Sequence, residues 1–111
     1  MTASAIDQAV INNALIAAAH EMGTKLIRCA HSPIVREAQD CSAALIDAKG
    51  RVVAQAELIP IQLGSISHTL APCLELYPPE TLVEGDFFIT NDPYHGGQHI
   101  QDIFLFSPVF F

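Results

Sequence analysis

The chain is poor in basic side chains and lacks tryptophan altogether. Its 111 residues include five Lys and Arg against twelve Asp and Glu, which gives a formal net charge of −7. Nucleic-acid binding depends on clustered Lys and Arg that neutralise phosphates, so this composition argues against a nucleic-acid partner. An acidic balance mildly favours a site that gathers cations, although such a charge more often serves solubility.

Long hydrophobic runs and cysteine pairs are also missing. No apolar run reaches the ~18 residues that a membrane span needs. The N-terminus carries Asp7 rather than a basic region, which argues against a secretory signal and predicts a cytoplasmic protein. The three cysteines, Cys29, Cys41 and Cys73, form no CxxC pair and are odd in number. We expect buried, reduced thiols rather than a disulfide framework.

Half of the residues are hydrophobic, which is ample for the core of one domain. The apolar run at residues 108–111, however, would form an exposed patch of the kind that marks an interface or an aggregation-prone surface. We therefore interpret residues 1–111 as the N-terminal part of a larger domain. A truncated gene product is the alternative, and a naturally split subunit is less favoured.

The N-terminal third predicts one long helix, over residues 5–28. Ser4 and Asp7 can form a capping box. His31-Ser32-Pro33 ends the pattern, because the residue before a proline avoids the helical region. Apolar residues recur at spacings of three and four, as expected for one face buried in the core: Ile11, Leu15, Ala18, Met22, Leu26 and Cys29.

The remaining pattern predicts an α+β fold in the order α-β-β-α-β-β. Residues 42–46 and 51–55 indicate a hairpin closed at Gly50. We expect an irregular link over 58–64 and a short helix from Ser65, as its cap, to Leu76. Two further strands follow, a buried one at 87–90 and a last one at 103–110, and the short helix presents one apolar face: Ile66, Leu70 and Leu74.

Residues 91–102 form the most informative segment, because they combine two histidines, two aspartates and Gly96-Gly97 between two apolar stretches. The backbone freedom of the two glycines and the Asp-Pro step predict a loop of defined shape between two strands. Loops held by strands often carry ligand-binding residues. His99 and Asp102 are three residues apart. On a turn they can converge on one point, whereas on a regular strand they would face opposite sides. Imidazole and carboxylate together suit Mn, Fe or Zn.

Other residues have a functional and a structural interpretation side by side. Asp92 and His95 can orient a ligating histidine, or they can be a turn-forming Asx residue and a polar loop residue. Glu37 and Asp40 can reach the loop as a general base or ligand. Alternatively, either can pair with Arg36 on the surface, where an ion pair contributes little.

The order of motifs resembles the hydantoinase B/oxoprolinase family. Residues 91–103, NDPYHGGQHIQDI, are similar to the family stretch that reads NDPY, a small variable residue, GG and THLPDI. Residues 32–42 resemble SP-x-I-x-ER-x-DFS, and residues 47–55 resemble D-x-x-G-x-VAQ. Residues 59–65 resemble IPVHLGSM, and Gly85-Asp86 matches its PGD. The resemblance covers roughly residues 20–110.

The chain departs from the family pattern at several positions. Ala38 replaces the arginine of Glu-Arg, which removes a group that could clamp a substrate carboxylate. Gln98 and Gln101 replace threonine and proline, so the rim of the loop can differ in substrate preference or rigidity.

The resemblance implies a metal-dependent, ATP-linked hydrolase subunit that opens cyclic amides such as hydantoin or 5-oxoproline. A ketone carboxylase subunit, or an inactive assembly fragment, is the alternative. By the resemblance, His99 and Asp102 would bind a divalent metal (Mn, Zn or Fe), with a third ligand beyond Phe111. From their own position in the sequence, we expect Glu37 and Asp40 to be catalytic. Because Gly96-Gly97 lacks the lysine of a phosphate-binding loop, ATP would be bound by a hydantoinase A-type subunit or another domain. We expect a hetero-oligomer, and an inactive isolated chain.

Overall fold

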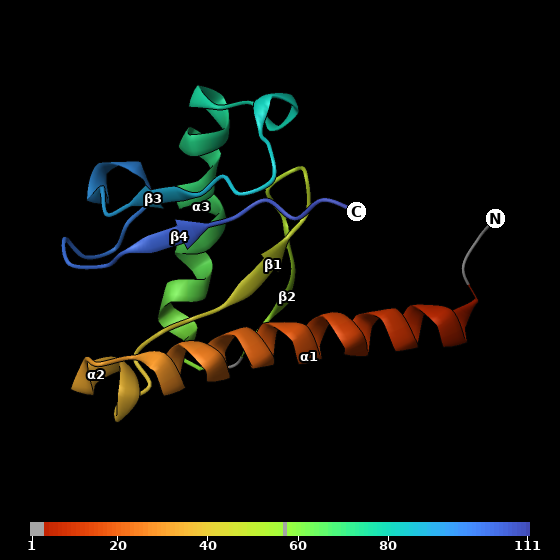
Figure 1. Ribbon diagram of the computed structural model, residues 1–111, viewed down its shortest axis with the longest axis horizontal. Coiled ribbons are helices and arrows are strands. Elements are labelled where there is room, and N and C mark those ends of the chain that lie inside the picture. Colours follow the sequence, from red (N-terminus) through yellow and green to blue (C-terminus); the bar gives the residue numbers. More distant parts are fainter. Residues whose placement is uncertain (1–3, 57) are drawn as a thin grey trace.

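The computed structural model describes residues 4–56 and 58–111, which form the predicted α+β arrangement of a long helix, two small antiparallel sheets and a second helix (Figure 1). Helix α1 (Ala5–Cys29) begins at the expected capping box, where Ser4 Oγ accepts from the Asp7 N–H at 3.2 Å and the Asp7 carboxylate accepts from the Ser4 N–H at 3.1 Å. No helix of the described part is long and apolar enough to cross a membrane.

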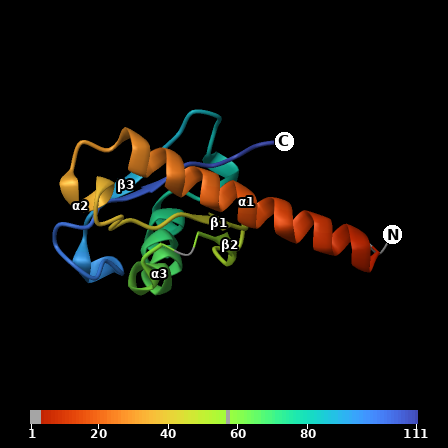
Figure 2. The same cartoon turned by 90° about the horizontal axis from the view of Figure 1, so that it is seen from below.

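The face of α1 that packs differs from the predicted stripe. Ala19 and Gly23 are buried, whereas Ile11, Met22 and Leu26 are about half exposed. A Cβ atom added to Gly23 would lie 2.6 Å from Leu58 Cδ1, so the glycine lets the segment after β2 approach the helix closely. Spacing alone could not choose between neighbouring faces of a helix with apolar residues on several sides. The N-terminal half of α1 extends away from the other elements (Figures 1 and 2).

The first sheet is the predicted hairpin of β1 (Ala44–Ile46) and β2 (Val52–Gln55), paired antiparallel with Leu45 opposite Ala54. Gly50 closes its turn with φ of 79°. The Asp47 carboxylate accepts from the Lys49 and Arg51 N–H groups, both at 2.9 Å. The bonds from the Arg51 N–H and from Arg51 Nε, and to a smaller extent that from the Lys49 N–H, hold the pKa of Asp47 below its usual range.

Helix α3 (Pro60–Leu76) begins five residues before the predicted cap. Pro60 occupies its first position, where a missing N–H costs nothing and the fixed φ suits a helix. Ser65 is therefore buried inside the helix, and its hydroxyl donates to the Gln62 carbonyl at 2.8 Å. Pro72 also lies inside α3, so the His68 carbonyl has no N–H to accept from at the usual position.

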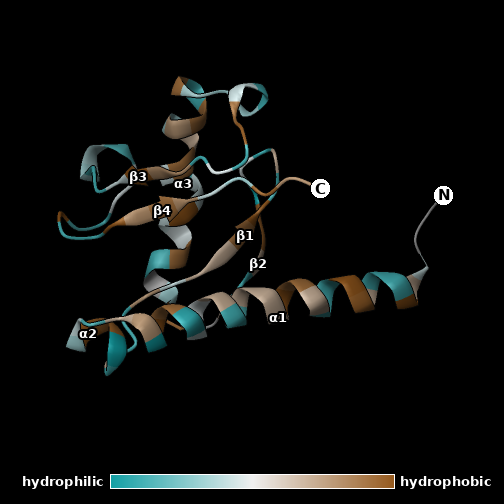
Figure 3. Ribbon diagram, in the orientation of Figure 1, coloured by the Kyte–Doolittle hydropathy of each residue, from teal (hydrophilic) through white to brown (hydrophobic). Residues whose placement is uncertain are grey.

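The second sheet pairs β3 (Phe88–Thr90) with β4 (Phe104–Phe106), antiparallel, with Ile89 opposite Leu105. Phe104 is buried, but Ile89 and Leu105 are 72% and 62% exposed. The expected buried strand is therefore covered on one face only, and the last strand is shorter than predicted. Figure 3 shows apolar colouring on both strands.

The core between these elements is built mainly from small side chains. Its fully or nearly buried members are Ala19, Cys41, Ala43, Ala54, Ala56, Ser65, Ile66, Thr69, Leu70 and Phe104. The expected apolar face of the second helix is confirmed at Ile66 and Leu70, with Leu74 partly covered.

The three cysteines differ in burial. Cys41 is buried as expected, Cys73 is partly buried and Cys29 is exposed, and all three are free thiols. Burial raises the pKa of the Cys41 thiol, with the neighbouring Asp40 carboxylate adding to the effect. Burial likewise raises the pKa of Cys73. The prediction of burial is confirmed for Cys41 and fails for Cys29, the last residue of α1, which is exposed.

Candidate functional site

The β3–β4 loop (residues 91–103) is a folded turn rather than an open connection. It begins with the short 3-10 helix η2 (Pro93–His95), capped by Asp92, whose Oδ1 accepts from the Tyr94 N–H at 2.8 Å. Gly96 follows with φ of 101°, a conformation that favours glycine. A second turn closes where the Asp102 N–H donates to the His99 carbonyl at 3.3 Å.

Both glycines of this loop are required by close backbone approach. A Cβ atom added to Gly96 would lie 2.7 Å from the Thr69 nitrogen and 2.8 Å from the His68 carbonyl carbon, both in α3. One added to Gly97 would lie 2.9 Å from the Asp92 oxygen. The loop is therefore packed on the middle of α3 and on itself, which fixes the directions of its side chains.

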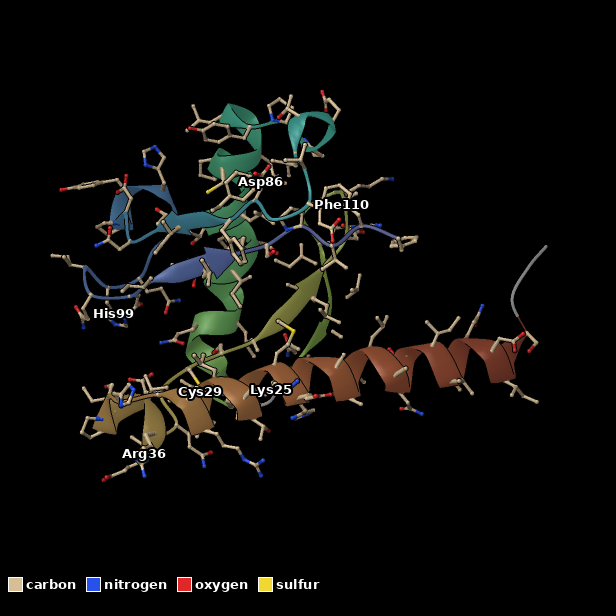
Figure 4. All side chains as sticks on the ribbon, in the orientation of Figure 1. Lys25, Cys29, Arg36, Asp86, His99 and Phe110 are labelled. Carbon is tan, nitrogen blue, oxygen red and sulfur yellow. The ribbon has the colours of Figure 1, made fainter. Side chains whose placement is uncertain are left out.

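His99 and Asp102 converge, as expected for a turn. His99 Nδ1 lies 2.9 Å from Asp102 Oδ2. The side chain of Asp102 is 14% exposed, whereas that of His99 is 50% exposed. The Asp102 carboxylate is thus mostly covered, and the His99 ring bonded to it lies partly in solvent. Nε2 of that ring takes no part in this bond. In Figure 4 the His99 side chain lies below the ribbon of the β3–β4 loop, on the side of helix α2.

The 2.9 Å separation of His99 Nδ1 and Asp102 Oδ2 is that of a hydrogen bond. Asp102 therefore orients the ring, and Nε2 is the ring nitrogen left to bind an ion. Within residues 4–56 and 58–111, no third His, Cys, Asp or Glu completes a metal site with them.

A second histidine–carboxylate pair lies on the same loop. His95 Nδ1 is 2.7 Å from Asp92 Oδ2. The bond to His95, followed by that from the Tyr94 N–H, holds the pKa of the Asp92 carboxyl below its usual range. Asp92 therefore combines the two interpretations of the sequence, because it caps the turn and also orients a histidine. The histidine that Asp92 orients is His95, whereas the ring of His99 is oriented by Asp102.

Glu37 and Asp40 lie in the connection between α2 (Pro33–Arg36) and β1. Glu37 caps α2 and is exposed, while Asp40 is half-buried and accepts a hydrogen bond from Gln62 Nε2 at 3.3 Å. The surface pair with Arg36 is not formed, since none of the ion pairs in the described residues includes that arginine.

Helix α2 and the β3–β4 loop lie at the same end of the molecule in both views (Figures 1 and 2). Both acidic candidates from the sequence therefore share that end with His99. No contact joins Glu37 or Asp40 to the loop histidines in the bonds of the described part.

Sequence reasoning missed two connections that shape this region. One is the link from Gln62 at the start of α3 to Asp40, which requires helix α3 to begin before Ser65. The other is the packing of Gly96 on α3. Gly96-Gly97 was the available signal for the second, because glycine permits close approach of two backbones.

Comparison with known proteins identifies the family to which this chain belongs. Residues 4–111 match the family model described as hydantoinase B/oxoprolinase. This is nearly the whole chain, and the chain is therefore a member of that family.

Several curated relatives are similar over most of the chain. It is 41% identical to a 5-oxoprolinase of Saccharomyces cerevisiae over 81% of its length, and 36% identical to 5-oxoprolinase 1 of Arabidopsis thaliana over 97%. It is 34% identical to the caprolactamase subunit beta of Pseudomonas jessenii over 99%. The alignments cover 7%, 8% and 19% of those relatives, so the chain spans a small part of their length. No solved structure matches the chain.

Proposed function

We propose that this chain supplies part of the metal site of an ATP-linked enzyme that opens cyclic amides in the cytoplasm. The observation that carries the proposal is the convergence of His99 and Asp102, 2.9 Å apart on a loop packed against α3, in a member of the hydantoinase B/oxoprolinase family. The names 5-oxoprolinase and caprolactamase support a cyclic amide as substrate. A ketone carboxylase of the same family is the second candidate.

His99 and Asp102 would hold a divalent ion, Mn, Zn or Fe, together with a third ligand from elsewhere. A bound ion would supply Lewis-acid polarisation of a carbonyl or phosphoryl oxygen. Asp102, being mostly covered, keeps the imidazole in one orientation. Little reordering of the ring is then needed when a ligand binds.

Asp40 is the better candidate of the two acidic residues for moving a proton at this end of the molecule. Its carboxylate is half-buried and held by Gln62, whereas Glu37 is exposed and its carboxylate has no partner in the described bonds. A held carboxylate can accept a proton from an attacking water in a defined direction. We propose the same role for Glu37 only as the alternative.

ATP would be bound by a hydantoinase A-type subunit, or by another domain, in a hetero-oligomer. The designation of the Pseudomonas jessenii relative as a beta subunit supports an enzyme with more than one kind of subunit. The chain itself offers no phosphate-cradling motif to replace such a partner.

Metal binding can be tested with Mn²⁺ and the chain itself. We expect Mn²⁺ to broaden the NMR signals of the His99 ring and the Asp102 carboxylate first, and His99→Ala to abolish this broadening. His95→Ala is the matched control, because it removes the other loop imidazole and should leave the effect intact. Equal broadening in the His99→Ala variant would contradict the site assignment. In the assembled enzyme, His99→Ala should abolish turnover while the thermal midpoint changes little.

A further inference from the structure

The charge of this chain is divided unevenly along the sequence. All five Lys and Arg residues lie at or before Arg51, together with five of the twelve acidic residues. The first 51 residues are therefore formally neutral, and residues 52–111 carry the whole net charge of −7. Helix α3, β3 and β4 belong to this second part. Lys49 of the hairpin turn lies near Glu75 on one side of α3, but none of the ion pairs in the described residues involves Glu75, Glu80, Glu84 or Asp86.

A groove of about 480 Å³ runs between β3 and the C-terminal end of α3. Its wall on the α3 side includes Cys73, Leu76 and Tyr77, and its opposite wall is residues 87–90. Tyr77 and Phe88 meet across it, with ring centroids 5.8 Å apart. The charged side chain among its lining residues is Asp86.

The groove follows the unpaired edge of β3. It is lined by Phe87 and Ile89, which point to one face of the strand, and also by Phe88 and Thr90, which point to the other. None of its lining residues belongs to β4, the strand that pairs with β3 in the described part. A groove that touches both faces of β3 but not β4 must lie along the opposite edge. Figure 1 shows β3 with β4 on one side and the upper part of α3 near the other.

An open strand edge beside apolar side chains has a characteristic occupant. Such an edge presents backbone N–H and C=O groups in a row, and an added strand satisfies them while its alternate side chains enter the neighbouring pockets. Ile89 and Phe87 are 72% and 61% exposed, so they offer apolar surface to such a strand. Figure 4 shows Asp86 beside the start of β3, near the upper part of α3.

We infer that the β3 edge is a strand-addition site for a partner polypeptide. The partner segment is extended, with apolar residues at alternate positions and Lys or Arg between them. The apolar residues would pack on Phe87 and Ile89, which point to one face of the strand. The basic residues would lie near Asp86 and offset the net negative charge of residues 52–111. This binding surface lies outside the His99–Asp102 pair and does not depend on the proposed function.

The test uses a blocked eight-residue peptide of alternating valine and lysine, added to the whole chain. NMR-detected hydrogen exchange should show saturable protection of those β3 amides that are not bonded to β4. A peptide of the same sequence with every backbone nitrogen methylated keeps the charge and the apolar side chains but has no N–H group to donate to a strand edge. We expect its affinity to be at least tenfold weaker.

Two substitutions separate the groove from the rest of the sheet. Ile89→Lys and Leu105→Lys add the same charge at directly paired positions of similar exposure, but only Ile89 lines the groove. Ile89→Lys should weaken peptide binding at least tenfold, and Leu105→Lys less than threefold.

The inference is overturned by any of four results: no saturable protection of β3, equal binding of the N-methylated peptide, equal losses in the two variants, or protection of β3 that rises with protein concentration alone. The last result would identify a second copy of the chain as the occupant.

Discussion

Replacing Gly96 by alanine should destabilise the protein more than the same change at any other glycine with a positive φ. An L-residue in the left-handed region costs roughly 1–2 kcal/mol. At Gly96, with φ of 101°, the added methyl would also lie 2.7 Å from the Thr69 nitrogen and 2.8 Å from the His68 carbonyl carbon. These are backbone atoms of a helix and cannot rotate away. Forced overlap of this kind typically costs a further ~1–3 kcal/mol. We expect a total loss of about 2–5 kcal/mol, a large part of a typical domain's stability.

Two other glycines serve as internal controls for this prediction. Gly50 has φ of 79° but nothing within 4 Å of an added Cβ, so Gly50→Ala should cost only the conformational part. In Gly23→Ala the methyl would meet Leu58 Cδ1, the end of a flexible side chain. Since alanine favours helix by about 0.5–1 kcal/mol over glycine, that change should be nearly neutral.

Urea unfolding followed by far-UV circular dichroism measures all three glycine variants. The reasoning is refuted if Gly96→Ala is no more destabilising than Gly50→Ala, because the close approach of Gly96 to α3 would then not limit the size of the side chain.

Three further predictions follow from the same structure. Ala19→Leu should lower the free energy of unfolding by about 1–3 kcal/mol because Ala19 is fully buried. Ile11→Ala, at a 55% exposed site, should change it by less than ~0.5 kcal/mol. Equal effects of the two changes in urea unfolding would show that the wrong face of α1 was assigned to the core. The bond from His95 lowers the pKa of Asp92. The stabilising effect of this bond is therefore present above the unfolded pKa of about 3.9 and is lost as pH falls through the lower folded value. His95→Ala should raise the Asp92 pKa in a carboxyl-carbon titration, and an unchanged pKa would rule out the pairing. The chain alone should show no ATP-dependent opening of hydantoin or 5-oxoproline with Mn²⁺, because no third ligand joins His99 and Asp102 in the described part; turnover by the purified chain would contradict this.

Local chemistry carried much of the fold prediction. The Ser4–Asp7 capping box, the Gly50 turn and the break at Pro33 each depend on residues near one another in the sequence, and each is present as expected. The start of α3 was misjudged because Pro60 was interpreted as part of a loop, although proline is equally suited to the first position of a helix.

The errors about burial have a different cause. Periodicity shows that a helix or strand has an apolar face, but it does not say which neighbouring element covers that face. Met22 and Leu26 satisfy the helical spacing and yet are about half exposed, while the buried position goes to Gly23, where the segment after β2 approaches. Ile89 and Leu105 likewise belong to an apolar strand pair whose outer face has no cover in the described residues.

The candidate site was partly predictable. The spacing of His99 and Asp102 allowed convergence only if the segment turned, and Gly96-Gly97 favoured that turn. The partners of Asp40 and Asp92 depended on distances across the fold, or on the rotation of the η2 turn. These could not be derived from the sequence pattern.

The proline within α3 has a consequence for how the sequence of the β3–β4 loop can vary among related proteins. Pro72 leaves the His68 carbonyl without its helical donor, and the backbone of His68–Thr69 is where Gly96 packs. Gly96 therefore packs on the turn of α3 that Pro72 interrupts. A substitution at either position should change the contact between the loop and α3. Natural variation at positions 72 and 96 should therefore be correlated, and a double-mutant cycle between them should depart from additivity.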